Sequence, residues 1–209
     1  PESALSGLKM AIEPGSFLFY RRELALPGGW KNGRVLLHIG AADQVAEVYV
    51  NQKSVGQHQG GYTAFTVDIT DALRETNELV IRVFDDLRDT TMPYGKQTLK
   101  RGGMWYTPVS GIWQTVWLES VPETYIQKLR IDNHGYAVTI SITPKLSGKV
   151  TVHGLGEFPL VDGKVSISPK NPHLWSPEDP YLYDFSIETE TDKVDSYFAI
   201  RSLEVKENR

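Results

Sequence analysis

The residues best suited to bind a ligand lie in the segment from Pro93 to Tyr106, which reads PYGKQTLKRGGMWY. Aromatic faces pack against the apolar C–H patches of sugars, and charged or amide side chains bond the hydroxyls, so this combination is typical of a carbohydrate site on a loop. The candidate binding residues are Tyr94, Lys96, Gln97, Arg101, Trp105 and Tyr106. Gly102 and Gly103 allow the backbone to approach a ligand closely. The alternative interpretation is that Trp105 and Tyr106 pack between two domains, because an interface uses the same residue types.

Other candidate groups for chemistry are weaker. Asp85, Asp86 and Asp89 could supply oxygens to a structural calcium ion, but their spacing is not that of an EF-hand loop, and we favour a solvated acidic loop. Zinc requires grouped ligands, and the histidines show no H-x-x-x-H or comparable spacing. They are His38, His58, His134, His153 and His173. We therefore expect no cofactor and no metal, apart from the calcium alternative.

The composition excludes several classes of function. The 209 residues carry 22 Lys and Arg against 26 Asp and Glu, a net charge of −4, without a basic run. We therefore expect neither nucleic acid nor a membrane as a partner. No apolar stretch approaches the roughly 20 residues of a membrane span. The chain has no cysteine, which excludes disulfides, thiol catalysis and iron–sulfur clusters and is compatible with a cytoplasmic location.

The elements that must position the Pro93–Tyr106 segment are predicted to be β-strands. Runs of strand length recur along residues 1–122, at Phe17–Leu26, Arg34–Ile39, Val45–Val50, Thr63–Ile69, Glu78–Phe84 and Ile112–Leu118. Asn51-Gln52 follows one of these runs at the position of a tight turn. The stretch from Asp85 to Ser110 is longer than most loops in a compact domain, and such loops are usually functional or disordered.

Strand signals continue beyond Pro122-Glu123. They fall at Tyr125–Ile131, Ala137–Thr143, Lys149–His153, Val165–Ile167, Tyr181–Ile187 and Lys193–Val205. Turn residues separate them and no helical pattern intervenes, which predicts a small immunoglobulin-like sandwich without the Cys pair of antibody domains. The sequence thus predicts an all-β protein of two domains, residues 1–122 and 123–209. Trp113, Trp117 and Trp175 are expected in the cores or at the seam between these domains.

Ordered motifs in both halves resemble glycoside hydrolase family 2. In the first half these motifs are Tyr20-Arg21-Arg22, Val48-Tyr49-Val50-Asn51, the run from Gly60 to Thr70, Gly95-Lys96-Gln97 and the run from Trp105 to Trp113. They resemble the family's N-terminal sugar-binding domain, a galactose-binding-like jelly roll. In the second half, Pro172–Glu178, Pro180–Tyr183 and Tyr197–Arg201 resemble the family's immunoglobulin-like domain.

The resemblance implies both an activity and a missing part. The family contains β-galactosidases, β-glucuronidases and β-mannosidases, so the parent protein would hydrolyse β-glycosides with retention and need no redox cofactor. The family's two catalytic glutamates lie on a TIM barrel that would follow Arg201, and its first jelly-roll strands would precede Pro1. We therefore expect an inactive fragment that supports the barrel, shapes the sugar cleft with the Pro93–Tyr106 loop and favours oligomers. Its partners would be a carbohydrate, the barrel and a second copy.

At two positions the family's functional residues are not expected in this sequence. Glu78 follows an Asn, as the family's catalytic acid does, but Glu78 opens an apolar strand and we expect it to be structural. Trp105 stands five residues before Ser110, where some β-galactosidases carry an acidic sugar contact, so that contact is not expected here. A stand-alone carbohydrate-binding module and a structural protein-interaction sandwich remain the alternatives to a fragment of a glycosidase.

Overall fold

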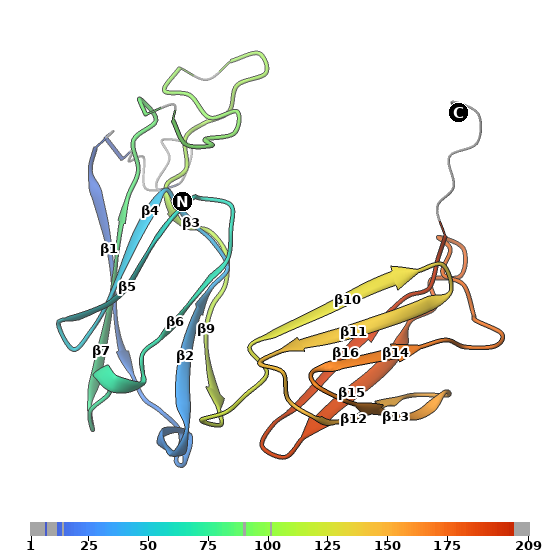
Figure 1. Cartoon of the computed structure of the whole chain (residues 1–209). Helices are drawn as coiled ribbons and strands as arrows, with labels where there is room; N and C mark the ends of the chain where they lie inside the picture. The colour runs from blue at the N-terminus through green and yellow to red at the C-terminus, as the bar shows by residue number, and fades with distance from the viewer. Residues whose placement is uncertain (1–6, 8–11, 14, 90, 101, 203–209) are drawn as a thin grey trace. The chain divides into compact units, whose positions relative to one another are not determined.

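The computed structural model describes residues 7, 12–13, 15–89, 91–100 and 102–202. Within these ranges the regular structure consists of sixteen β-strands and two short 3₁₀ turns, so the all-β prediction is confirmed (Figure 1). Contacts divide the chain into two compact units between Val121 and Pro122. No helix in the described part of the chain is long and apolar enough to cross a bilayer.

The first unit is a jelly-roll sandwich of antiparallel sheets. One sheet has the order β1 (Phe17–Leu24), β7 (Asn77–Phe84), β4 (Val45–Val50) and β5 (Lys53–Gln59). The facing sheet has the order β6 (Phe65–Asp68), β2 (Arg34–Ile39) and β9 (Val116–Val121). A short pair, β3 (Ala42–Asp43) with β8 (Gly111–Ile112), lies beside them, and the 3₁₀ turns are η1 (Trp30–Asn32) and η2 (Thr70–Ala72).

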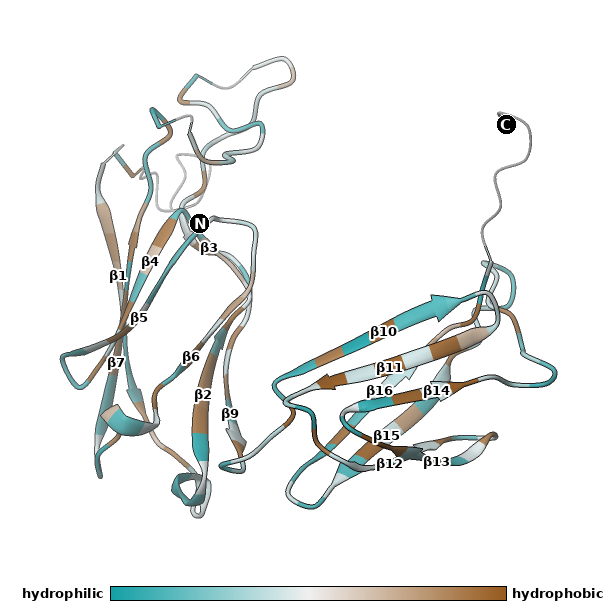
Figure 2. Ribbon diagram, viewed as in Figure 1, coloured by the Kyte–Doolittle hydropathy of each residue, from teal (hydrophilic) through white to brown (hydrophobic). Residues whose placement is uncertain are grey.

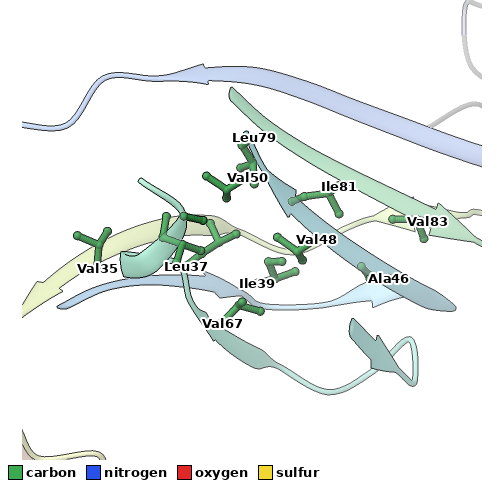
Figure 3. Packing of buried hydrophobic residues seen from close by; sticks show 13 residues of the cluster. Val35, Leu37, Ile39, Ala46, Val48, Val50, Val67, Leu79, Ile81 and Val83 are labelled. Atoms are coloured by element: carbon green, nitrogen blue, oxygen red, sulfur yellow. The ribbon is translucent and has the colours of Figure 1, made fainter. Parts of the chain in front are cut away.

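The two sheets of the first unit meet through side chains at alternate strand positions. Val48, Ile81 and Ile39 are each at most 2% exposed, and Figure 3 shows their side chains pointing into one common layer. Because side chains alternate between the faces of a strand, every second residue of β2, β4 and β7 enters this core. Each buried Val, Leu or Ile contributes about 1.5–3 kcal/mol relative to exposure, so this layer holds the two sheets together.

The second unit is a two-sheet sandwich of the immunoglobulin-like kind. Its first sheet has the order β10 (Lys128–His134), β11 (Ala137–Thr143) and β14 (Lys164–Ile167). Its second sheet has the order β13 (Gly156–Leu160), β12 (Gly148–Val152), β15 (Tyr183–Thr189) and β16 (Lys193–Phe198). Ile140 of β11 and Ile187 of β15 are fully buried in its core. Figure 2, coloured by hydropathy, shows that β11 is more hydrophobic than its neighbour β10.

The expected core position is wrong for two tryptophans. Trp113 and Trp117 are 48% and 46% exposed. The predicted single strand Ile112–Leu118 is in fact two, β8 and β9, and Trp113 lies in the break between them. Trp117 lies on the outer face of β9, where its ring stacks on His38 with centroids 4.9 Å apart. Trp175 of the second unit is half-buried, with the Arg201 guanidinium 5.3 Å from its ring centre.

The hairpin between β4 and β5 turns through Asn51 and Gln52, which both have positive φ, 52° and 70°. Two consecutive positive φ angles in a two-residue loop characterise the type I′ turn, which matches the twist of the strands. Asn tolerates this conformation, whereas Gln in the left-handed region costs about 1–2 kcal/mol. The turn is therefore strained at Gln52.

We predict that Gln52→Gly raises the free energy of unfolding by about 0.5–1 kcal/mol, because glycine relieves the left-handed strain but loses more entropy on folding. Urea denaturation measures the change. Gln57→Gly is the matched control, since Gln57 is an exposed residue of β5 without positive φ, and this change should lower stability. Equal effects of the two substitutions would contradict the prediction.

Candidate functional site

The candidate site is the loop that connects β7 to β8, residues 85–110, of which 85–89, 91–100 and 102–110 are described. Figure 1 shows it as the green segment that extends past the end of the sandwich, beyond β3 and β4. Strands β7 and β8 fix the two ends of this loop. Its middle has to be fixed by other contacts.

Gln97 supplies the main contact. Its Nε2 donates to Asp43 Oδ2 at 3.2 Å and to the Tyr94 carbonyl at 3.3 Å. Its Oε1 accepts the backbone N–H of Val109 at 2.6 Å. One amide therefore joins β3 to an early and a late part of the loop. The role of Gln97 in binding sugar hydroxyls stays a prediction, but its polar atoms are engaged in holding the loop.

Backbone bonds form two isolated bridges within the loop, a parallel one between Gln97 and Tyr106 and an antiparallel one between Gly102 and Trp105. Tyr106 N donates to the Lys96 carbonyl at 2.7 Å, and Thr98 N donates to the Tyr106 carbonyl at 3.1 Å. Nearer the tip, Gly102 and Trp105 exchange bonds of 3.3 and 3.1 Å. These bonds place Trp105 and Tyr106 on a backbone that is paired on both sides of the turn.

The loop presents aromatic rings at the surface. Tyr106 is 65% exposed and Trp105 is 42% exposed. Trp105 also lines a pocket of about 230 Å³ whose other walls are Leu87, Tyr94, Gln97, Thr98 and Leu99. The pocket thus brings together three of the predicted site residues, Tyr94, Gln97 and Trp105. Lys96 is exposed on the same loop, and Arg101 lies outside the described residues.

A second aromatic pair adjoins the loop and was not among the predicted site residues. Tyr62 and Trp113 are half-exposed, and their rings meet edge to face with centroids 6.0 Å apart. Trp113 Nε1 donates to the Gly61 carbonyl at 2.7 Å. The Tyr62 hydroxyl lies so close to Gly95 that a Cβ there would come within 2.6 Å of it. The sequence signal for this pair was the Gly60-Gly61-Tyr62 run, whose glycines let the backbone pack tightly.

Two buried carboxylates lie beneath the loop. Asp43 is 5% exposed and Asp85 is 6% exposed. Ser110 Oγ donates to Asp85 Oδ2 at 2.5 Å, and Asp43 packs against Gly61, where any side chain would collide with it. Burial and the neighbouring charge of Asp85 raise the pKa of Asp43 to about 6, while the bond from Gln97 opposes this rise.

The remaining acidic candidates are bonded to protein groups. Asp86 pairs with Arg88, whose guanidinium lowers the pKa of Asp86 to about 2, and Asp89 accepts bonds from Thr91. Among the described residues, no group of three or more His, Cys, Asp or Glu side chains could hold a metal ion. Calcium binding at Asp85, Asp86 and Asp89 stays a prediction, and the described residues provide no cluster of ligands for it. Glu78 forms an ion pair with Arg21 of the adjacent strand β1.

Comparisons with known proteins agree on one family. The sugar binding domain model of glycosyl hydrolases family 2 matches residues 11–122, and a second model of that family matches residues 121–201. The chain is 31% identical to a β-galactosidase of Thermoanaerobacter pseudethanolicus, over 91% of this chain and 29% of the relative. It is 25% identical to mouse β-glucuronidase, over 88% of this chain and 34% of the relative.

Solved structures show the same fold. A β-glucuronidase from an uncultured Clostridium aligns with a TM-score of 0.73 at 23% identity, over 98% of this chain and 38% of that protein. The β-glucuronidase of Bacteroides uniformis aligns with a TM-score of 0.66 at 27% identity, over 90% of this chain and 26% of that protein. The chain thus spans about a quarter to a third of the curated relatives that it matches.

We predict that Gln97→Ala lowers the free energy of unfolding by about 1–3 kcal/mol, because it leaves the buried Asp43 carboxylate without that donor. The same substitution should speed cleavage of the loop by thermolysin. Lys96→Ala, at an exposed neighbouring position, is the control and should leave both properties unchanged. Equal proteolysis of the two variants would show that Gln97 does not hold the loop.

The raised pKa of Asp43 predicts a pH dependence of stability. A carboxyl whose folded pKa exceeds its unfolded value stabilises most below the unfolded value, and this contribution is lost as the pH rises through the folded value, here about 6. Between pH 5 and 8 the wild type should therefore lose about 1 kcal/mol relative to Asp43→Asn. Urea denaturation of both proteins across this range measures the difference. Parallel pH profiles would contradict the raised pKa.

Proposed function

Because the chain belongs to the glycosyl hydrolases of family 2, we propose that it forms the non-catalytic N-terminal part of a β-glycosidase. In this proposal the parent protein hydrolyses O-glycosidic bonds of β-galactosides or β-glucuronides. The observation that carries the assignment is the anchored loop with its exposed Trp105 and Tyr106. The two units would support the catalytic barrel of the parent and complete its sugar cleft.

The loop would act as one wall of that cleft. The indole of Trp105 can cover the apolar face of a pyranose ring, and the pocket beside it, about 230 Å³, has the size of a single ring. Lys96 and Arg101 would supply charged donors for hydroxyl or carboxylate groups. Gln97 would act indirectly, because its hydrogen bonds fix the backbone that carries these side chains. Holding the rings in place in advance reduces the entropy that binding costs.

The chain's own carboxylates support a non-catalytic role. Retaining glycosidases use two carboxyl groups roughly 5 Å apart, on either side of the sugar bond. Asp43 and Asp85 interact electrostatically, but both are buried and hydrogen-bonded to Gln97 and Ser110. A substrate does not reach them without displacing the loop. We therefore assign the hydrolytic step to the parent's barrel, and a cytoplasmic location and self-association stay predictions.

We predict that the 209-residue chain hydrolyses neither p-nitrophenyl β-galactoside nor p-nitrophenyl β-glucuronide above the blank rate, whereas the parent-length protein hydrolyses one of them. In the parent, Trp105→Ala should lower kcat/KM about three- to tenfold, the loss expected for one aromatic stacking contact. Tyr136→Ala, at an exposed ring of the second unit, is the control. Turnover by the isolated chain would overturn the proposal.

A stand-alone carbohydrate-binding module is the second candidate, since Trp105 and Tyr106 are exposed in this chain itself. Titration calorimetry with methyl β-galactoside and methyl β-glucuronide distinguishes the two functions. Binding by the isolated chain that disappears with Trp105→Ala would favour the module. Absence of heat with both sugars would favour the cleft-wall role.

A further inference from the structure

The second unit has a polar trough on the outer face of its second sheet, across β12, β15 and β16 (Figure 1). Val152, Phe185 and Ile187 of these strands are buried in the core, so alternation turns the residues between them outward. The outward side chains that line the trough are those of Thr151, His153, Asp184, Ser186, Asp195 and Tyr197. Its volume is about 490 Å³, within the range of about 300–1,000 Å³ that is usual for small-molecule sites.

The strand register brings these side chains together. Ser186 of β15 lies opposite Thr151 of β12 on one side and opposite Asp195 of β16 on the other. In the adjacent row of the same face, Asp184 lies opposite Tyr197. Opposite residues of antiparallel strands have Cβ atoms about 4.5–5.5 Å apart. Two small hydroxyl groups, two carboxylates and one phenol ring therefore share a small area of this face.

The protein itself does not engage the acidic groups of the trough. Within the described part of the chain, the side chains of Asp184 and Asp195 have no hydrogen-bond or ion-pair partner, and Tyr197 is 59% exposed. Charges in the next row of the same face are paired, since Lys149 Nζ lies 3.6 Å from a carboxylate oxygen of Glu188. The carboxylates of the trough are therefore available to accept bonds from a ligand.

We propose that the trough binds a neutral oligosaccharide. The ring of Tyr197 can cover the apolar face of a pyranose, and the carboxylates of Asp184 and Asp195 can accept bonds from sugar hydroxyls. The hydroxyl groups of Thr151 and Ser186 both donate and accept, as sugar hydroxyls do. No Lys or Arg is among the described residues that line the trough, so a uronate or a sulfated sugar would meet two carboxylates without a counter-charge.

This site goes beyond the proposed cleft wall. It belongs to the second unit alone and contains no residue of the loop that carries Trp105. A sugar bound there would keep a polymeric substrate attached to the parent protein, whichever bond the parent hydrolyses. The two roles can therefore be tested on different residues and can fail independently.

Amide NMR of the 209-residue chain tests the proposal with two neutral probes, β-1,4-galactotetraose and cellotetraose. At least one of them should shift the amide signals of residues 151–153, 184–186 and 195–197, and the shifts should saturate. Tetragalacturonate has the same number of rings with a carboxylate on each, and it should leave these signals unchanged.

Variants of the trough provide the controls. Tyr197→Ala and Asp184→Ala should each raise the Kd of the neutral tetraose about tenfold, because each removes one stacking contact or one charged acceptor. Tyr197→Phe keeps the ring and should keep most of the affinity. Tyr136→Ala, at an exposed ring outside the trough, and Trp105→Ala, in the loop of the first unit, should leave the Kd unchanged.

The proposal is overturned if neither neutral tetraose shifts the trough signals at about 10 mM, a concentration that reveals even weak binding. It is also overturned if the shifts fall on the loop and disappear with Trp105→Ala, since the loop would then be the sugar site of the chain. Equal binding of tetragalacturonate, or tighter binding of spermidine than of either neutral tetraose, would overturn it as well. The trough would then not select a neutral sugar, or would be a site for cations.

Discussion

The hydrogen bond between the Gln97 amide and the Asp43 carboxylate sets the position of the loop. A buried carboxylate without a donor costs several kcal/mol, and Asp43 lies in a place where Gly61 and the loop exclude water. Gln97 meets this requirement and at the same time binds the Tyr94 and Val109 backbone. One side chain, Gln97, thus links the position of the loop to the hydrogen bonding of the buried Asp43.

The strands with clean alternation were predictable from the sequence, and those with interrupted patterns were not. Val45–Val50 and Ala137–Thr143 have the predicted bounds because their buried residues recur at every second position, and Arg34–Ile39 has them because it is a short apolar run of strand length. β5, KSVGQHQ, was missed because Val55 is the sole large apolar residue of its run. The break between β8 and β9 follows from contacts that no local pattern reveals, among them the bond from Trp113 to Gly61.

The same division applies to the site. For Trp105 and Tyr106 the sequence left two interpretations open, a sugar site and packing between domains; the structure shows rings that are 42% and 65% exposed, and their role stays a prediction. The hydrogen bond between Gln97 and Asp43 could not be predicted, because Asp43 lies 54 residues earlier and the sequence near either residue does not indicate the pairing. Tyr62 and Trp113 likewise meet across 51 residues of sequence, next to the bond from Trp113 to the Gly61 carbonyl.

The location of the anchor has a consequence for how this loop can evolve. The bonds of Gln97 reach Asp43 of β3 and Tyr94 and Val109 of the loop, whereas Leu99, Lys100 and Met104 take no part in them. Substitutions at Leu99, Lys100 or Met104 would therefore leave the three bonds of Gln97 in place. The tip of the loop can thus vary in sequence with little cost to the stability of the sandwich.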